Sequence, residues 1–520
     1  MTEPHISPYR HGWLLALLVL VLSGGAFLMD GNVGISFADE GYLWGGVEAL
    51  KSGAVPIRDF HAYDPGRYGW LAGWSYLLGD GLVSLRMGCA LFACIGVWCG
   101  LLAASRISRD WKFLLLVALT LSQWMQPRYK VFEQAISLMA IYVAVRLIER
   151  PTLRQHALTG AFVGLMAFFG RNHGVYLLGA FGLMMLFLAR GEWARLPGRL
   201  LTLGGGIVFG YLPQLAMLAF VPGYLGAYVR QLHTDLAVGT NLATSVRWPW
   251  RISAESLGLH WWSAFSEGCF YLALPIGLLV LAVVLLRCPR PALLRDPVLL
   301  AAGCVTLTYA HHTFSRADYV HLAHSAPAFA LAIVALAAAF GERTWMPHLV
   351  AGVLFAASTL AITPKAEFVM EMREPVGGFR PLKIRGQTMH VHLQSAVLLR
   401  LANRVAHELA KPGEGVAFLP HWPGLYPATG SVSPFYQTYF ILPATAAEEE
   451  VTLAAMGSRH VTWIMLQDSE LDGRSDLRFR NTNPRTFAYL QRHFRRVEMP
   501  NFPPMATILR RIEPPVTAAH

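Results

Sequence analysis

Asp39 and Glu40 stand shortly after the first apolar segment of the chain, and their carboxylates can act as a base. A carboxylate at the boundary of a membrane can have a raised pKa, which suits it to take a proton from a hydroxyl group. The alternative interpretation is an acidic, solvated start of a loop. The pair is therefore a candidate for general-base chemistry, and both interpretations stay open at this point.

A second polar cluster, with Arg128, Lys130 and Glu133, lies between the third and fourth apolar segments. Arginine and lysine in such a position commonly extend their charged ends toward water, which is the simpler interpretation. The functional interpretation is that Arg128 or Lys130 contacts a phosphate group and that Glu133 is a second acid.

A third cluster, Arg171, Asn172 and His173, is enclosed by Gly170 and Gly174 between two further apolar segments. A tight turn accounts for the two glycines, but it does not require the three polar residues. The sequence therefore leaves a plain turn and a substrate contact as alternatives.

A fourth cluster combines four histidines with an arginine and an aspartate in one short stretch: His311, His312, Arg316, Asp318, His321 and His324. Histidine and aspartate are zinc ligands, so a metal site is one interpretation. Helical or turn spacing would not bring all of these side chains together, and no cysteine assists. A polar turn at the membrane interface is the simpler interpretation.

The composition indicates which elements must position these residues. Only 14% of the 520 residues are charged, 54% are hydrophobic and the mean hydropathy is +0.41, whereas soluble proteins carry about 25% charged residues. A polytopic α-helical membrane protein is expected. A helix needs about 20 apolar residues to cross a bilayer. The sequence has about eleven candidate segments, at 12–29, 82–104, 112–126, 132–148, 157–170, 174–190, 200–221, 268–287, 298–312, 323–341 and 346–362.

The distribution of positive charge predicts the orientation of these segments. The net charge of +11 could suggest nucleic acid, but the excess arginine lies in short loops between apolar segments, so no nucleic-acid partner is expected. Lysine and arginine concentrate in the even-numbered short connections, which marks these as cytoplasmic. The sequence thus predicts a multi-pass protein of the inner (plasma) membrane with a cytoplasmic N-terminus.

Two domains follow from this topology. Residues 1–363 form the predicted transmembrane domain, with outer loops at 30–81 and 222–267, and residues 364–520 form a small α/β domain in the periplasm or exterior. The pattern in the second domain predicts helices at 388–410 and 484–494 and strands at 416–419, 461–466 and 506–510.

The first outer loop resembles that of the GT-C membrane glycosyltransferases. The shared pattern is an Asp-Glu pair after the first helix, a Gly-x-x-Pro-x-x-Asp-Phe stretch, a Tyr-x-Pro-Gly turn, and a Gly…Arg entry into the second helix. In this chain the matching positions are Asp39, Glu40, Gly53, Pro56, Asp59, Phe60, Tyr63, Pro65, Gly66, Gly79 and Arg86. The branch it most resembles is the protein O-mannosyltransferase-like group, which includes bacterial enzymes acting on lipid A and other envelope polymers. Many relatives have two prolines in the turn, where this chain has Asp64-Pro65.

The resemblance implies an inverting mechanism in which Asp39 is the base and Glu40 assists it as base, hydrogen-bond partner or metal ligand. Relatives often carry an acid in the second cluster, a polar turn in the third, and an Arg-x-Asp…His element in the fourth that holds the phosphate of the donor. The substrate-binding residues implied in this way are Arg58, Asp59, Tyr63, Arg128, Lys130, Glu133, Arg171, Asn172, His173, Arg316, Asp318 and His321.

The expected function is therefore transfer of a hexosyl or pentosyl group at the outer face of the membrane. The donor would be a polyprenyl-phosphate-linked sugar, and the acceptor a glycan, a lipid such as lipopolysaccharide, or a protein of the cell envelope. No cofactor is assigned, and the need for a divalent cation is left open.

Two other function classes are alternatives to this one. A secondary transporter or flippase of lipid-linked sugars would carry ionisable residues and broken helices near the membrane midplane. The apolar segments here contain almost no charged residues, and the charges gather at their outer ends. A non-catalytic scaffold of envelope assembly is argued against only by the resemblance.

Overall fold

Two compact units make up the protein. The computed structural model describes residues 8–238, 244–253, 258–289, 294–341, 343–374, 378–500, 502–503 and 505–512. Unit 1 comprises Met1–Gly31, Arg86–Phe220 and Asn241–Met370, and unit 2 comprises Asn32–Leu85, Val221–Thr240 and Glu371–His520. The first outer loop therefore packs with the C-terminal part of the chain.

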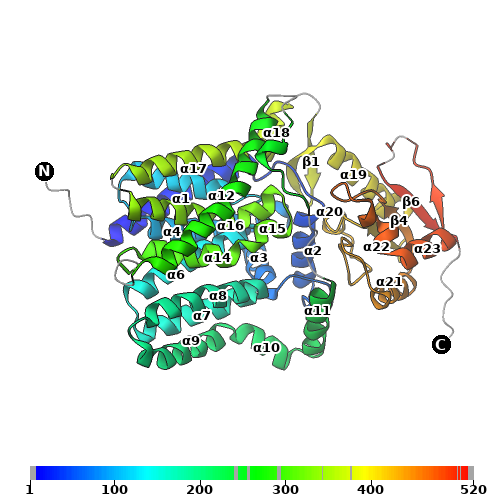
Figure 1. Ribbon diagram of the computed structural model, residues 1–520. Coiled ribbons are helices and arrows are strands. Elements are labelled where there is room, and N and C mark those ends of the chain that lie inside the picture. Colours follow the sequence, from blue (N-terminus) through cyan, green and yellow to red (C-terminus); the bar gives the residue numbers. More distant parts are fainter. Residues whose placement is uncertain are drawn as a thin grey trace. The chain divides into compact units, whose positions relative to one another are not determined.

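Unit 1 is built from helices (Figure 1). Each predicted apolar segment coincides with a helix, except that residues 200–221 form two helices. The helices that match the predicted segments are α1 (Pro8–Asp30), α4 (Leu82–Ala104), α5 (Trp111–Gln123), α6 (Val131–Glu149), α7 (Leu153–Phe169), α8 (Arg171–Ala189), α9 (Leu196–Gly210), α10 (Leu212–Phe220), α12 (Leu259–Arg287), α14 (Pro297–Tyr309), α16 (Tyr319–Phe340) and α17 (Met346–Ile362). The short helix α15 (His311–Ser315) lies between α14 and α16, and α18 (Glu367–Arg373) follows α17.

The described part of the chain has seven helices that are long and apolar enough to cross a membrane: α1, α4, α6, α8, α12, α16 and α17. An eighth is present if α9 and α10, which meet at a bend of 54°, are one span. The chain is thus a polytopic α-helical membrane protein, as the composition predicts. The total of about eleven spans depends on α5, α7 and α14, which have 13, 17 and 13 residues, and it stays a prediction.

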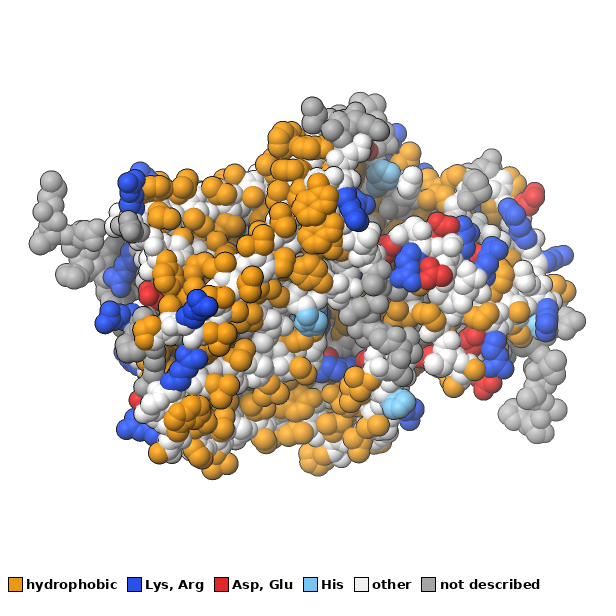
Figure 2. Space-filling model, in the orientation of Figure 1, with side chains coloured by type: hydrophobic (Ala, Val, Ile, Leu, Met, Phe, Trp, Pro, Cys, Tyr) orange, Lys and Arg blue, Asp and Glu red, His pale blue; other side chains and the backbone are white. Residues whose placement is uncertain are grey.

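The surface of unit 1 agrees with this interpretation. Hydrophobic side chains cover its helices in Figure 2. Leu28 of α1 is 84% exposed and Leu279 of α12 is 67% exposed. Exposed apolar areas of this extent are typical of surfaces that face lipid or another protein.

Glycines let α7 and α9 approach each other closely. A Cβ atom added at Gly206 would lie 2.2 Å from the carbonyl oxygen of Ala157, and one added at Gly164 would lie 2.1 Å from that of Ile207. Helices in membranes commonly associate through small residues, because these allow extensive backbone contact. The α7–α9 crossing therefore requires glycine at these positions.

Unit 2 combines the first outer loop with a small α/β structure. Its elements are α2 (Asp39–Lys51), α3 (Pro65–Leu78), α11 (Tyr224–Val238), β1 (Phe379–Ile384), β2 (Gln387–His392), α19 (Leu393–Asn403), β3 (Gly415–Leu419), α20 (Leu425–Thr429), α21 (Ala446–Ser458), β4 (Val461–Leu466), α22 (Phe479–Thr482), α23 (Pro484–His493), β5 (Phe494–Val497) and β6 (Thr507–Arg511). A four-stranded sheet has the order β3-β4-β6-β5, in which β3 and β4 are parallel and the other pairs antiparallel.

The three predicted strands and the helix at 484–494 are confirmed to within a residue or so. The prediction of one helix over 388–410 is wrong at its start. Residues up to His392 form β2, which pairs with β1 in an antiparallel hairpin, and the helix begins at Leu393. The apolar residues in the later part of the segment repeat with the helical period of 3.6 residues, and the prediction extended this helix over the preceding strand.

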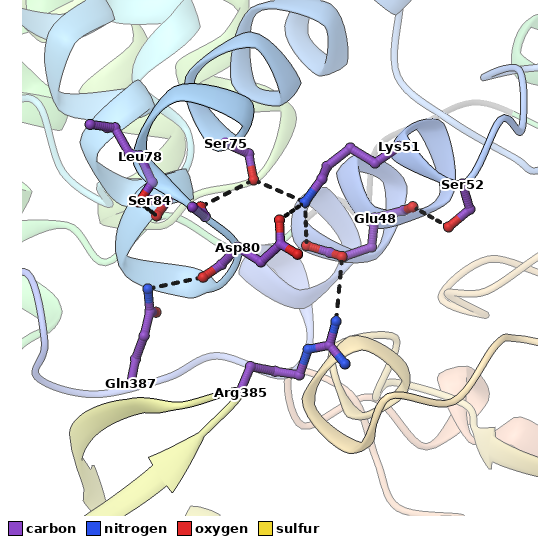
Figure 3. A network of polar contacts seen from close by, with 10 residues as sticks. Glu48, Lys51, Ser52, Ser75, Leu78, Asp80, Ser84, Arg385 and Gln387 are labelled. Atoms are coloured by element: carbon purple, nitrogen blue, oxygen red, sulfur yellow. Dashed lines mark hydrogen bonds and ion pairs between the residues drawn. The ribbon is translucent and has the colours of Figure 1, made fainter.

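A polar network ties the first outer loop to this hairpin (Figure 3). The ammonium group of Lys51 pairs with the carboxylate of Asp80 and lies 3.7 Å from that of Glu48. Arg385, in the turn between β1 and β2, places a guanidinium nitrogen 3.9 Å from Glu48, and the side-chain amide of Gln387 donates to the carbonyl of Asp80 at 3.1 Å. These contacts explain why residues so far apart in the sequence share one unit.

Gly206→Ala tests the packing of α7 on α9. Because the added methyl group meets backbone atoms, we expect it to lower the free energy of unfolding by about 1–3 kcal/mol. Gly205→Ala is the matched control on the same helix, since a Cβ atom there has nothing within 4 Å. Alanine is the better helix former, so this control should leave stability unchanged or raise it by up to about 1 kcal/mol. Denaturation in detergent measures both, and equal stability of the two variants would contradict the close approach.

Candidate active site

The acidic pair of the sequence motif lies at the start of α2 in unit 2. Asp39 is the first residue of the helix and is half-buried, and Glu40 is only 1% exposed. The backbone N–H of Ser36 donates to the Glu40 carboxylate at 3.3 Å. The N-terminus of a helix carries partial positive charge, which stabilises carboxylates there. The fold can therefore keep two acidic side chains beside each other.

Contacts with C-terminal residues of the same unit position the start of α2. A Cβ atom at Gly41 would lie 2.4 Å from the backbone of Gly424, so the two chains touch through glycines. Gly424 N–H donates to the carbonyl of Phe37 at 2.8 Å, and Gly34 N–H donates to that of His390 at 2.7 Å. The segment that carries the acids is therefore held on two sides by residues more than three hundred positions later.

Aromatic side chains surround the next residue of α2. The hydroxyl of Tyr42 lies 2.8 Å from Nδ1 of His61 and donates to its carbonyl at 2.7 Å. The Tyr42 ring lies 5.0 Å from that of Tyr63 and 5.8 Å from that of Tyr439, and His61 N–H donates to Tyr436. Burial, followed by the electrostatic effect of Tyr68 and Tyr63, raises the pKa of Tyr42 well above its ordinary value, so Tyr42 stays a neutral phenol.

Arg58 and Asp59 form a local clamp in the loop. Two guanidinium nitrogens of Arg58 donate to the two carboxylate oxygens of Asp59, each at 2.8 Å. This hydrogen bonding lowers the pKa of Asp59, and the N–H of Val55 donates to the same carboxylate at 2.7 Å. Arg58 also donates to the carbonyl of Pro222 at 3.4 Å. The structure thus shows a turn-stabilising role for both residues, and their contact with substrate stays a prediction.

Two residues that the sequence did not single out lie near this group in unit 2. Arg67 is 6% exposed and its guanidinium lies 5.1 Å from the centre of the Tyr63 ring. His421 is 8% exposed, its ring lies 6.1 Å from that of Tyr439, and its Nε2 has no hydrogen-bond partner among the described residues. Burial lowers the pKa of His421 to about 4, so this imidazole is neutral at pH 7. A charged residue right after the Pro65-Gly66 turn was the available signal for Arg67.

Unit 1 brings together three of the four polar clusters. His173, which is fully buried in α8, places Nε2 3.8 Å from the carboxylate of Glu133 at the start of α6. Its Nδ1 lies 3.2 Å from the hydroxyl of Tyr309 at the end of α14. On the same side, the Asn172 amide lies 3.5 Å from Nε2 of His312. The second, third and fourth clusters therefore meet at one end of the helices.

The histidines of the fourth cluster stack against one another. The ring of His312 lies 4.8 Å from that of His311 and 5.0 Å from that of His324, and His324 lies 5.3 Å from His321. Tyr176 of α8 bonds to His311 at 2.8 Å. His311, His312 and His324 are not among the predicted substrate-binding residues, although the sequence places them in the cluster.

Asp318 organises the residues around it. Its carboxylate caps α16 by accepting from His321 N–H at 2.8 Å, lies 2.8 Å from Nδ1 of the same histidine, and is 3.2 Å from Nε of Arg316. Burial raises the pKa of Asp318, but the hydrogen bonds with His321 and the charges of His321 and Arg316 outweigh this and lower it. The predicted Arg316–Asp318–His321 group is therefore assembled in the structure.

The remaining cations of unit 1 have different surroundings. Arg128 pairs with the Asp30 carboxylate at 2.6 Å and donates to its carbonyl at 2.7 Å, which ties the cation to the end of α1. Lys130 is the residue before α6, and Arg171 is the first residue of α8. For Arg128 the structure thus shows an ion pair with Asp30, and its predicted contact with phosphate remains untested.

The sequence leaves a metal site as one interpretation of the fourth cluster. Among the described residues, no group of three or more histidine, cysteine, aspartate or glutamate side chains has an arrangement that could hold a metal ion.

No family model matches the sequence, and no match is found among curated proteins. Among solved structures, ArnT from Cupriavidus metallidurans bound to undecaprenyl phosphate is 14% identical, with a TM-score of 0.50 over 96% of this chain and 98% of that one. Its apo state is 12% identical, with a TM-score of 0.50 over 96% and 97%. The oligosaccharyltransferase from Archaeoglobus fulgidus in the apo form is 13% identical, with a TM-score of 0.46 over 96% and 74%.

The likeness to ArnT extends over nearly the whole of both chains and shows the fold. The chain therefore has the fold of ArnT, and the resemblance indicated by the first outer loop is confirmed at the level of the fold.

His421 gives unit 2 a measurable pH dependence. An unfolded histidine has a pKa of about 6.5, whereas burial holds the folded pKa of His421 at about 4. Between these values the unfolded chain binds more protons, so stability is lost as the pH falls, by up to about 1.4 kcal/mol per pH unit. His421→Gln should flatten this slope, as measured by chemical unfolding of the full chain at about pH 7, 6 and 5. The control His460→Asn changes an exposed imidazole and should keep the wild-type slope; a wild-type slope in His421→Gln would argue against a buried neutral imidazole.

Proposed function

We propose that this chain is a membrane glycosyltransferase that transfers a sugar from a polyprenyl-phosphate carrier to an acceptor hydroxyl at the outer face of the membrane. The observation that carries the proposal is the acidic pair Asp39 and Glu40, held at the start of α2 in a chain with the fold of ArnT. ArnT has been solved with undecaprenyl phosphate bound, which supports a lipid phosphate as the carrier.

Asp39 is proposed as the general base. Its carboxylate takes the proton of the acceptor hydroxyl while the acceptor oxygen attacks the anomeric carbon of the donor sugar. The bond from that carbon to the phosphate oxygen breaks, its electron pair leaves with the polyprenyl phosphate, and the configuration inverts. Glu40, which is more deeply buried than Asp39, supports the base as a hydrogen-bond partner.

The proposed phosphate-binding residues belong to unit 1. Arg316 and His321 are both held by Asp318, so their donor groups are fixed before a ligand arrives. Preorganised cations stabilise the negative charge that develops on a leaving phosphate. Asn172 and His173 extend the same polar region, and Lys130, the residue before α6, is proposed to contact the phosphate with them.

The donor is proposed to carry a hexose or a pentose, and the acceptor is a glycan, a lipid or a protein of the cell envelope. The membrane is proposed to be the plasma membrane, with the N-terminus in the cytoplasm and the C-terminal part outside. The reason is that lysine and arginine concentrate in the even-numbered short connections between apolar segments, and such loops are usually cytoplasmic.

A flippase or transporter of lipid-linked sugars is the second candidate. The bend of 54° between α9 and α10 favours it, because broken helices occur at transporter binding sites. Reconstituted protein that moves a lipid-linked sugar across vesicles without transferring the sugar would select this candidate.

Asp39→Asn tests the proposed base. The amide keeps the shape of the side chain but does not take up a proton, so we expect kcat to fall by about 10²–10⁴ with little change in KM. Sugar transfer from a polyprenyl-phosphate-linked donor to envelope acceptors, followed by mass spectrometry, measures the rate. Asp476→Asn is the control, because this exposed carboxylate of unit 2 pairs with Arg474 at 2.6 Å and is not part of the proposed site. Wild-type turnover by a folded Asp39→Asn protein would eliminate Asp39 as the base.

Arg316→Ala tests the proposed phosphate contact. Loss of the guanidinium should raise the KM for the donor about tenfold or more and leave that for the acceptor nearly unchanged. Arg195→Ala, which removes a 72% exposed arginine side chain of unit 1, should change neither constant. Equal effects of Arg316→Ala on donor and acceptor would argue against a role in holding phosphate.

A further inference from the structure

His324 is a buried histidine whose two ring nitrogens, Nδ1 and Nε2, make no hydrogen bond with the described residues. It lies in the second turn of α16 and is 5% exposed. Buried polar groups without partners destabilise a fold, so each one in a native structure calls for an explanation.

The groups around His324 are themselves able to carry protons or charge. His312 of α15 lies 5.0 Å away with its ring nearly perpendicular, and His321 lies 5.3 Å away on the same helix. Glu133 and Lys130, at the start of α6, also act electrostatically on His324. The carboxylate of Glu133 favours a protonated His324, whereas the ammonium group of Lys130 disfavours it. Because these two effects oppose each other, the charge of a bound ligand can decide whether an imidazole of the cluster takes up a proton.

The two neighbouring imidazoles link His324 to the proposed phosphate-binding residues. His321 uses Nδ1 toward Asp318 at 2.8 Å, which leaves Nε2 as its second polar atom. His312 uses Nε2 toward Asn172 at 3.5 Å, and His173 on α8 contacts Glu133. Tyr309, at the end of α14, bonds to His173. The rings of His312 and His321 therefore lie 5.0 Å and 5.3 Å from the His324 ring, so a proton on one of these three imidazoles is close to the other members of the cluster.

We propose that the cluster of His312, His321 and His324 takes up one proton when a polyprenyl phosphate binds to unit 1. The proton comes from solvent and forms one N–H bond on an imidazole nitrogen; no other bond is made or broken. The phosphate brings up to two negative charges, and beside a buried side chain such as His324 these charges strongly favour imidazolium over imidazole. His324 acts through His312 and His321 and is a positioning residue, not a catalytic one.

This inference rests on the proposed function and adds a role for His312 and His324, which are not among the predicted substrate-binding residues. During sugar transfer, the carrier phosphate gains negative charge as its bond to the sugar breaks. The proton held by the cluster offsets that charge, so phosphate binding and turnover both become dependent on pH.

The test is a count of protons taken up on binding. The full chain in detergent is titrated calorimetrically with farnesyl phosphate, a short and soluble polyprenyl phosphate, in two buffers of different ionisation enthalpy. Wild-type protein should take up about one proton per phosphate bound near pH 7, beyond the protonation of the ligand itself, which is measured separately. His324→Gln should take up none beyond the ligand's own, and His312→Gln should take up less than wild type.

The control is His348→Gln, which replaces a histidine of unit 1 that pairs with Asp110 at 3.1 Å, and it should keep the wild-type proton count. No proton uptake by wild type, or the same uptake by wild type and both cluster variants, would overturn the inference while phosphate binding still supports the proposed function. Absence of any binding by wild type would overturn both. Because His324→Gln and His312→Gln alter the cluster independently, a failure of one variant to fold leaves the other to decide whether the cluster takes up the proton.

Discussion

Ionisable side chains beside apolar helices must be paired, because an unpaired charge in a medium of low dielectric constant is very costly. Unit 1 follows this constraint at the ends of its helices. Arg128 pairs with Asp30 at 2.6 Å, Lys365 pairs with Glu267 at 2.6 Å, and Asp318 holds Arg316 and His321. The first two pairs join segments that are distant in the chain, so the same interactions that satisfy the charges also fix how those helix ends are arranged. The polar region proposed for phosphate is built from these helix ends.

The acidic pair of unit 2 depends on a different kind of support. Asp39 and Glu40 begin a helix whose first turn is packed, glycine against glycine, on Gly424. The network of Lys51, Asp80 and Arg385 joins the same loop to the β1–β2 hairpin (Figure 3). The C-terminal part of the chain is therefore more than an appended domain. It forms the framework on which the first outer loop folds, so a change in that framework is expected to move the acids.

The sequence predicted the features that depend on residues close together along the chain, namely the helices and the buried strands. Apolar segments located the helices of unit 1, and short runs such as Val461–Leu466 located the buried strands. The β1–β2 hairpin was missed because Phe379–Ile384 contains Pro381 and two basic residues and is largely exposed, so it shows no alternation of apolar and polar side chains. Arg316, Asp318 and His321 contact one another because they lie close together in the sequence at the start of α16, while their role in binding phosphate stays a prediction.

By itself, the sequence determined the membrane class, the position of most helices and the four polar clusters, because length, hydropathy and local spacing are properties of short segments. Only the tertiary structure decided which clusters meet. Asn172 and His312 are 140 positions apart and become neighbours because α8 packs beside α14, while Gly41 and Gly424 touch because the outer loop folds with the C-terminal part. Such contacts depend on the packing of whole helices and sheets, and no local pattern of side chains encodes it. For the same reason the isolation of His324 was invisible: a lack of partners is a property of the folded surroundings.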